Sequence, residues 1–121
     1  MKVLLVDDSG TMRSIQKKIL VAMGITDISE AADGALALKA VAAARPDLIM
    51  MDWNMPNLSG IEALKKLKGD PATKAIPVIM VTSESEKTAI LEAIKIGAAN
   101  YIVKPFNADI IKEKIGPFLK T

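Results

Sequence analysis

Residues 48–52 read Leu-Ile-Met-Met-Asp, a short apolar run that ends on a carboxylate, and three more runs follow the same plan. The run at 3–6 ends on Asp7-Asp8, the run at 78–81 on Thr82, and the run at 101–103 on Lys104. If such runs form neighbouring parallel strands, their last residues meet in one crevice, where open α/β sheets bind ligands. Carboxylates, a hydroxyl and an ammonium would then converge, a set suited to a divalent cation and a phosphoryl group.

Length and composition indicate one module. A chain of 121 residues, half of them hydrophobic, can bury one core and is too short for two ordinary domains. We expect a single domain over residues 1–121, with no output domain after Thr121, no signal peptide and no membrane insertion, and hence a cytoplasmic protein. The net charge of +2 and the few aromatic residues argue against nucleic-acid binding. Because Cys and His are absent, any metal must be held by oxygen.

Strand-like and helix-like segments alternate along the whole chain. The first two predicted helices cover about 11–23 and 35–44, and the third runs from a capping box at Ser59 to a stop at 69–71. The fourth covers about 86–96, and the fifth begins after a cap at Asn107 or Asp109. Residues 26–31 form a weakly indicated strand. Gly116-Pro117 predicts a break in the last helix, because an interior proline costs about 3 kcal/mol.

This alternation predicts an α/β fold. Five βα units with strands that are apolar on both faces indicate a doubly wound, five-stranded parallel sheet between two helical layers. The flavodoxin-like strand order 2-1-3-4-5 is the common solution for five strands. It would place Asp7-Asp8 and Asp52 face to face, with Thr82 and Lys104 on the next two strands.

The predicted site has a definite chemistry. Carboxylates a few ångströms apart repel by roughly 4 kcal/mol per pair in a partly buried environment, and a cation relieves that repulsion. Oxygen ligands favour Mg²⁺, and a carboxylate beside Mg²⁺ and a lysine is a plausible nucleophile toward phosphorus. Taken alone, a strand-end Asp is usually a turn or cap, Thr82 could cap the region 83–86, and Lys104 could be a surface lysine. Only their joint placement favours a site for an aspartyl phosphate.

Four motifs in this order resemble one family. Val6-Asp7-Asp8-Ser9-Gly10-Thr11-Met12-Arg13, Met51-Asp52-Trp53-Asn54-Met55-Pro56, Val81-Thr82-Ser83-Glu84 and Val103-Lys104-Pro105-Phe106 are similar to the receiver domains of two-component response regulators. Within that family the chain resembles the stand-alone chemotaxis regulators, over essentially its whole length.

The resemblance implies roles for the predicted site residues. Asp52 matches the phosphoacceptor and Lys104 the phosphate-binding lysine, and Asp7 and Asp8 match the acidic pair. Mg²⁺ in the family is bound through the residues that match Asp8, Asp52 and the backbone carbonyl of Asn54. Thr82 matches the switch hydroxyl and Tyr101 the aromatic that swings inward with it. The peptide that matches Lys104-Pro105 is typically cis.

The resemblance also implies partners. Members of the family take the phosphoryl group from a histidine kinase and slowly hydrolyse their own phosphoaspartate. They are signalling switches and not enzymes that turn over other substrates, and a separate phosphatase can remove the phosphoryl group. Lys87, Tyr101 and Lys114 match the surface presented to the flagellar motor switch, on a protein expected to be a monomer. Trp53 and Glu84 match the neighbours of the acceptor. Ser9 replaces a bulky aromatic, which would alter access to the site and the phosphorylation lifetime.

Three alternatives have different signatures. A haloacid-dehalogenase-type phosphatase needs an acid two residues after its nucleophile, where Asn54 stands, and an amide cannot transfer the proton. A flavodoxin-like FMN carrier needs a phosphate loop after the first strand, where Asp7-Asp8 would repel the phosphate. The third alternative lies within the family: a single-domain receiver that acts as a phosphate sink or phosphorelay intermediate with a partner other than the motor.

Overall fold

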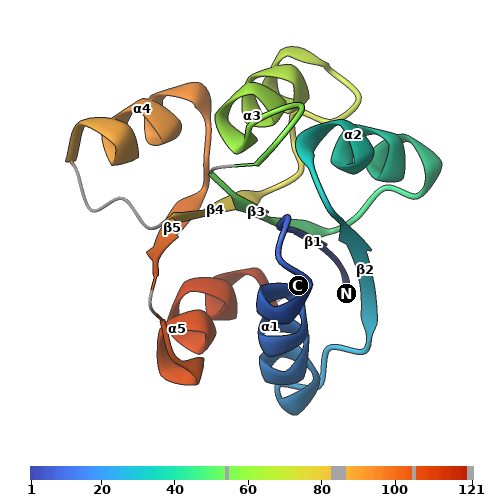
Figure 1. Ribbon diagram of the computed structural model, residues 1–121, viewed down its shortest axis with the longest axis vertical. Helices are drawn as coiled ribbons and strands as arrows, with labels where there is room; N and C mark the ends of the chain where they lie inside the picture. Colours follow the sequence, from blue (N-terminus) through green and yellow to red (C-terminus); the bar gives the residue numbers. More distant parts are fainter. Residues whose placement is uncertain (54, 83–86, 105, 120–121) are drawn as a thin grey trace.

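The computed structural model describes residues 1–53, 55–82, 87–104 and 106–119, which form a parallel sheet covered by helices (Figure 1). The elements in chain order are β1 (Lys2–Val6), α1 (Gly10–Ala22), β2 (Asp27–Ala31), α2 (Gly34–Ala43), β3 (Leu48–Asp52), α3 (Gly60–Gly69), β4 (Val78–Thr82), α4 (Lys87–Ile96), β5 (Asn100–Val103) and α5 (Ala108–Leu119). All strand pairs are parallel and the order is β2-β1-β3-β4-β5, so the predicted fold is confirmed.

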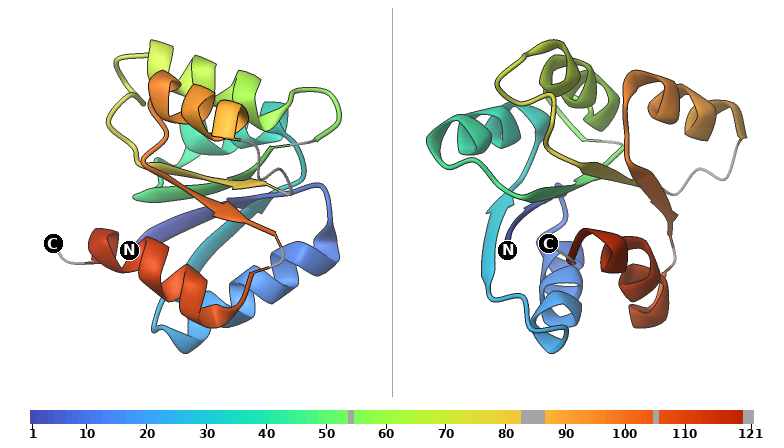
Figure 2. Two further views of the ribbon diagram at one scale, coloured as in Figure 1. Left: turned by 90° about the vertical axis from the view of Figure 1, so that its left-hand side faces the viewer. Right: turned by 180° about the vertical axis from the view of Figure 1, so that it is seen from behind.

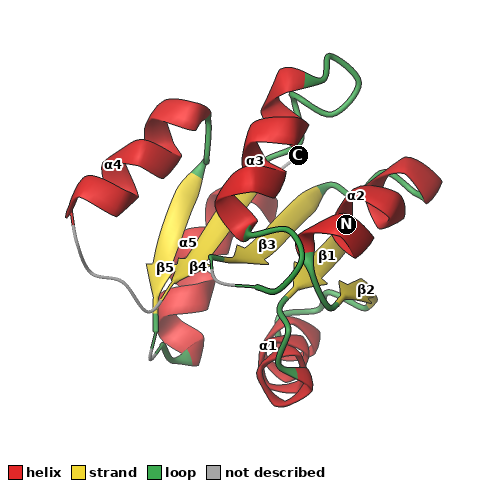
Figure 3. Cartoon of the chain, turned by 45° about the horizontal axis from the view of Figure 1, so that its top comes forward, coloured by secondary structure: helices red, strands yellow, loops and turns green. Residues whose placement is uncertain are grey.

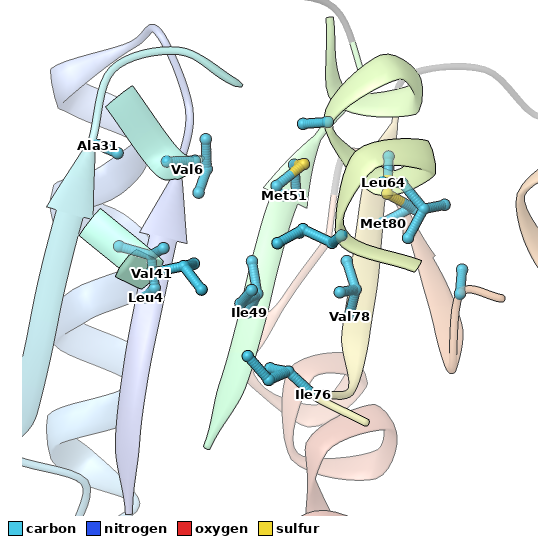
Figure 4. Packing of buried hydrophobic residues seen from close by; sticks show 14 of the residues in the cluster. Leu4, Val6, Ala31, Val41, Ile49, Met51, Leu64, Ile76, Val78 and Met80 are labelled. Atoms are coloured by element: carbon cyan, nitrogen blue, oxygen red, sulfur yellow. The ribbon is translucent and has the colours of Figure 1, made fainter. Parts of the chain in front are cut away.

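Helices cover both faces of the sheet. Helices α2, α3 and α4 lie on one side, and α1 and α5 lie on the other (Figures 1 and 2). Successive strand residues point to opposite faces, so each strand supplies both layers of the core. In β3, Ile49 and Met51 face α2 and α3 (Figure 4), whereas Leu48 and Met50 face α1 and α5. This double burial explains why β3 and β4 have no exposed residue.

The predicted helices and strands lie within a residue or two of the observed ones. The weakly indicated strand at 26–31 forms β2, although only Ala31 in it is buried. The capping box is confirmed: Glu62 N–H donates to Ser59 Oγ at 3.3 Å, and Ser59 Oγ donates to Glu62 Oε1 at 3.0 Å. Asn107, and not Asp109, caps α5, because Ile110 N–H donates to Asn107 Oδ1 at 2.9 Å. Within the described part of the chain, none of the helices has the length and hydrophobicity of a membrane span.

The predicted break at Gly116-Pro117 is wrong, because α5 continues through Pro117 to Leu119. Pro117 stands near the end of the helix, where it removes a single backbone hydrogen bond, to the carbonyl four residues earlier. The preceding turns are held by Ile111 and Ile115, which are fully buried against the sheet. Packing therefore outweighs the local cost of the proline.

Candidate functional site

Four strands end along one edge of the sheet (Figure 3), and a polar residue stands at or just after the end of each. Asp7 follows β1, Asp52 and Thr82 are the last residues of β3 and β4, and Lys104 follows β5. The strand order places β1, β3, β4 and β5 side by side, so these four residues stand along one edge. The carboxyl ends of strands are where sheets of this kind hold ligands.

Three carboxylates form the centre of the site. Asp7, Asp8 and Asp52 each offer one oxygen, and the three oxygens all lie within 4.8 Å of one another. Asp7 and Asp52 are buried, with exposed fractions of 1% and 7%, whereas Asp8 is exposed. An all-oxygen set that is open on one side fits Mg²⁺, which keeps several of its waters when it binds to protein. These residues could therefore hold Mg²⁺.

Lys104 pairs with two of these carboxylates. Its Nζ lies 3.1 Å from Asp52 Oδ1 and 3.3 Å from Asp7 Oδ2. Burial lowers the pKa of Lys104, but the hydrogen bond to Asp52 and the charges of Asp52 and Asp7 outweigh burial, so that the pKa is raised. Burial and then the charge of Asp7 raise the pKa of Asp52, against the opposing effect of Lys104. One ammonium thus partly neutralises a buried carboxylate pair.

The raised pKa of Asp52 makes its ionisation a cost to folding. Well below the ordinary Asp pKa of 3.8 the carboxyl is neutral in both the folded and the unfolded chain, so the cost is absent. The cost appears as the pH rises from there through the raised pKa of the folded chain. Without Mg²⁺ at pH 7, we expect Asp52→Asn to raise the thermal unfolding midpoint by roughly 3 to 8 °C. The difference should shrink toward zero near pH 3.

The matched control is Asp27→Asn, which removes an exposed carboxylate from β2 and should leave the midpoint unchanged across this pH range. Calorimetry in EDTA measures both variants. A lower midpoint for Asp52→Asn at pH 7 would show that the ion pair with Lys104 outweighs burial and repulsion, contrary to this expectation.

Thr82 and Lys104 are joined through the backbone. Thr82 is 1% exposed at the end of β4, and its carbonyl accepts a hydrogen bond from Lys104 N–H at 2.7 Å. A backbone hydrogen bond thus joins the last residue of β4 to the residue that follows β5. The region 83–86, which Thr82 could cap, lies outside the described residues.

Tyr101 of β5, the last strand of the sheet, lies against Lys114 of α5. Tyr101 is partly buried in β5, and Lys114 Nζ of α5 lies 4.7 Å from the centroid of its ring. The same ammonium lies 3.5 Å from Asn100 Oδ1. A lysine at this distance attracts the ring through a cation–π interaction. Both residues are predicted from the sequence as surface residues of the site, but their contact with each other is not.

The remaining predicted site residues divide into two groups. The side chain of Trp53 is partly buried and packs against the core beside α2 and α3. The backbone N–H of Trp53 donates to Val81 O at 3.0 Å. Lys87 is the first residue of α4. The other three, Asn54, Glu84 and Pro105, lie outside the described residues, and so does the predicted cis peptide.

Sequence reasoning missed one residue that touches this site. Arg13 Nη1 donates to the backbone carbonyl of Asp7 at 2.5 Å, and its Nε donates to Glu30 Oε1 at 3.0 Å. The only signal in the sequence was a basic residue in the first turn of the helix after the acidic pair. Its partner Glu30 lies 17 residues away, on β2, so spacing could not reveal the contact.

A five-stranded parallel sheet with an acidic cluster and a lysine at its carboxyl edge is typical of receiver domains, and comparison with known proteins gives the same class. Residues 3–116 match the family model of the response regulator receiver domain, so the chain belongs to this family. It is a CheY-like receiver: the chemotaxis protein CheY of Pseudomonas aeruginosa is 44% identical over 115 residues, which cover 95% of this chain and 93% of that protein. The chemotaxis protein CheY1 of Helicobacter pylori is 43% identical over 122 residues, covering 100% and 98%.

Solved structures agree with this assignment. The chemotaxis protein CheY4 of Vibrio cholerae superposes with a TM-score of 0.88 at 34% identity, over 97% of both chains. The receiver domain of the Francisella response regulator 1452 superposes with a TM-score of 0.89 at 32% identity, over 98% of this chain and 96% of that chain. The resemblance to the receiver family stated from the sequence is therefore confirmed.

Proposed function

We propose that this chain is a chemotaxis response regulator, a signalling switch that accepts a phosphoryl group on Asp52 in a Mg²⁺-dependent reaction. The observation that carries the proposal is the position of the Asp52 carboxylate, which has Lys104 Nζ at 3.1 Å and the oxygens of Asp7 and Asp8 within 4.8 Å. This is a nucleophile between an ammonium and a cation site. The membership of the chain in the receiver family supports the same assignment.

The phosphoryl donor would be the phosphohistidine of a chemotaxis-type histidine kinase, met in the cytoplasm. An Asp52 oxygen attacks the phosphorus, the P–N bond to the imidazole breaks, and the departing imidazole takes up a proton. Mg²⁺, when bound, offsets charge on the transferring oxygens. Asp8, Asp52 and the carbonyl of Asn54 would hold it, supported by Asp7. Lys104 Nζ, which contacts Asp52 Oδ1, would form an ion pair with the oxygens of the phosphoryl group once it is bound to Asp52.

Hydrolysis would be slow, because the position two residues after Asp52 is Asn54, and an amide cannot act as a general acid or base. The phosphoryl group would therefore persist long enough to be a signal. The protein would catalyse only its own phosphorylation and dephosphorylation, as a monomer, and a separate phosphatase could shorten the signal.

The output would be a change at the surface formed by α4, β5 and α5. Thr82 would move toward the phosphoryl group and Tyr101 would turn inward, away from Lys114. Two large apolar side chains of α4 already face solvent, Leu91 with 58% and Ile94 with 43% of their surface exposed. An exposed apolar pair on α4 suits a protein partner. We assign the flagellar motor switch as this partner, contacted also by Lys87.

Trp53, the only tryptophan and the neighbour of Asp52, gives a direct test of the metal step. We expect millimolar Mg²⁺ to change its fluorescence in a saturable way, and acetyl phosphate to change it further only when Mg²⁺ is present. Asp52→Asn should lose the second change. A response to acetyl phosphate in EDTA, or none to Mg²⁺ in the wild type, would contradict the proposal.

A further inference from the structure

Arg13 links three parts of the chain next to the acidic cluster. It projects from the first turn of α1, donates through Nη1 to the carbonyl of Asp7, and pairs through Nε with Glu30 of β2. The Arg13 side chain is 20% exposed and that of Glu30 is 37% exposed, so the pair is only partly open to solvent. Arg13 is therefore held at both ends of its guanidinium.

The carbonyl that Arg13 holds belongs to the peptide between Asp7 and Asp8. A peptide unit is planar, so fixing the direction of its C=O fixes the whole plane and limits φ of the next residue, Asp8. Both residues lie beyond the last residue of β1, where the backbone is not regular strand. A second bond, from Ser9 N–H to Asp7 Oδ1 at 2.9 Å, fixes the other side of this turn. Together these bonds hold the backbone at Asp8, whose carboxylate has an oxygen within 4.8 Å of oxygens of Asp7 and Asp52.

The positive charge of Arg13, in contrast to its hydrogen bonds, is expected to weaken the binding of a cation. A guanidinium near three carboxylates competes electrostatically with a divalent cation, so charge alone would make Arg13 unfavourable for metal binding. Glu30 offsets part of this charge. Orientation and charge therefore predict changes of opposite sign when Arg13 is replaced.

We propose that Arg13 is a positioning residue for the cation site: its guanidinium, anchored by Glu30, orients the Asp7–Asp8 peptide so that Asp8 completes the ligand set. This inference rests on the proposed function, since it concerns the Mg²⁺ that Asp8 and Asp52 would share. Residues that orient metal ligands through hydrogen bonds typically contribute about 10- to 100-fold to affinity. The effect on Mg²⁺ should lie at the lower end, because Asp52 keeps its own position.

The test compares three variants by Mg²⁺ titration of the unphosphorylated full chain, followed by Trp53 fluorescence and by the Mg²⁺-induced shift of the unfolding midpoint. Arg13→Gln removes both the positive charge and the planar guanidinium that donates to two partners at once. Arg13→Lys keeps the positive charge but loses this planar pair of donors. The matched control is Lys17→Gln, which removes a cation from the same helix and from the same Glu30, at 3.8 Å. Unfolding in EDTA reports separately on the fold of each variant.

We expect Arg13→Gln to weaken Mg²⁺ binding about tenfold, Arg13→Lys to weaken it less, and Lys17→Gln to leave it equal or slightly tighter. Equal or tighter binding by Arg13→Gln would overturn the inference and leave the metal site standing. If Arg13→Gln does not fold, wild-type affinity in Arg13→Lys overturns the inference in the same way. A wild type that does not bind Mg²⁺ at all overturns the proposed metal site and, with it, the inference.

Discussion

Lys104→Met should destabilise the protein in the absence of divalent cations by about 2 to 3 kcal/mol. The substitution leaves Asp7 and Asp52 buried without the ammonium that lies 3.3 and 3.1 Å from their oxygens. Removing one partner of a buried ion pair typically costs about 3 to 5 kcal/mol, and the 20% exposure of Lys104 reduces that figure. The unfolding free energy measured in urea with EDTA tests this value.

The same variant should respond more strongly to Mg²⁺. Lys104 and a divalent cation compete for the same carboxylates, so Mg²⁺ should recover much of the lost stability in Lys104→Met. Phosphoryl uptake should nevertheless fall by about 100-fold, because the charge on the transferring group loses a fixed cation. Lys112→Met, an exposed position on α5, is the matched control and should change neither quantity. Wild-type stability in EDTA for Lys104→Met would contradict the ion-pair account.

Gly60→Ala should have the largest effect on folding. A Cβ at Gly60 would overlap the carbonyl oxygen of Asp52 and lie 2.9 Å from its carbonyl carbon. Both atoms belong to the backbone of β3, which is buried and cannot move without displacing the Asp52 side chain. We expect a loss of more than about 4 kcal/mol, or no folded protein.

The control for this substitution lies on the same helix. Gly69 ends α3, and no atom lies within 4 Å of the position that a Cβ would take there, so Gly69→Ala should be neutral or add up to about 1 kcal/mol. Thermal and urea unfolding should show a large loss of stability for Gly60→Ala and no loss for Gly69→Ala. Similar stability for both would show that β3 and α3 can separate at no cost, contrary to the described packing.

The sequence was sufficient for the fold because burial leaves a simple pattern. The strands β3 and β4 are buried on both faces, so their apolar runs and turn residues predict them without ambiguity. In β2 only Ala31 is buried, so this edge strand had a weak signal. At Pro117, propensity predicted a break, but the buried Ile111 and Ile115 hold α5 together.

The site was predictable where it depends on strand ends and not where it depends on side-chain conformation. Strand order alone brings Asp7, Asp52 and Lys104 to one edge. The contact of Arg13 with the Asp7 carbonyl depends on one rotamer and on the distant Glu30. Such contacts need the packing of α1 against β2, which no spacing in the sequence encodes.

A second such contact steadies the loop after Asp52. Asn57 has a φ of 66°, in the left-handed region, and its Nδ2 donates to the buried Asp33 at 2.8 Å. Asp33 also accepts a hydrogen bond from Leu36 N–H at the start of α2. The bond from Leu36 is the main cause that lowers the pKa of Asp33, and the bond from Asn57 lowers it further. The sequence shows an Asn suited to a turn, but the partner that holds it there became visible only in the structure.

Phosphorylation of Asp52 can be measured by intact-mass analysis of the protein after incubation with acetyl phosphate and Mg²⁺. We expect one phosphoryl adduct on the wild type and on Asp27→Asn, none on Asp52→Asn, and none on any of them in EDTA. The adduct should be lost at alkaline pH, as an acyl phosphate is. An equal adduct on Asp52→Asn, or no adduct on the wild type with Mg²⁺, would contradict the account.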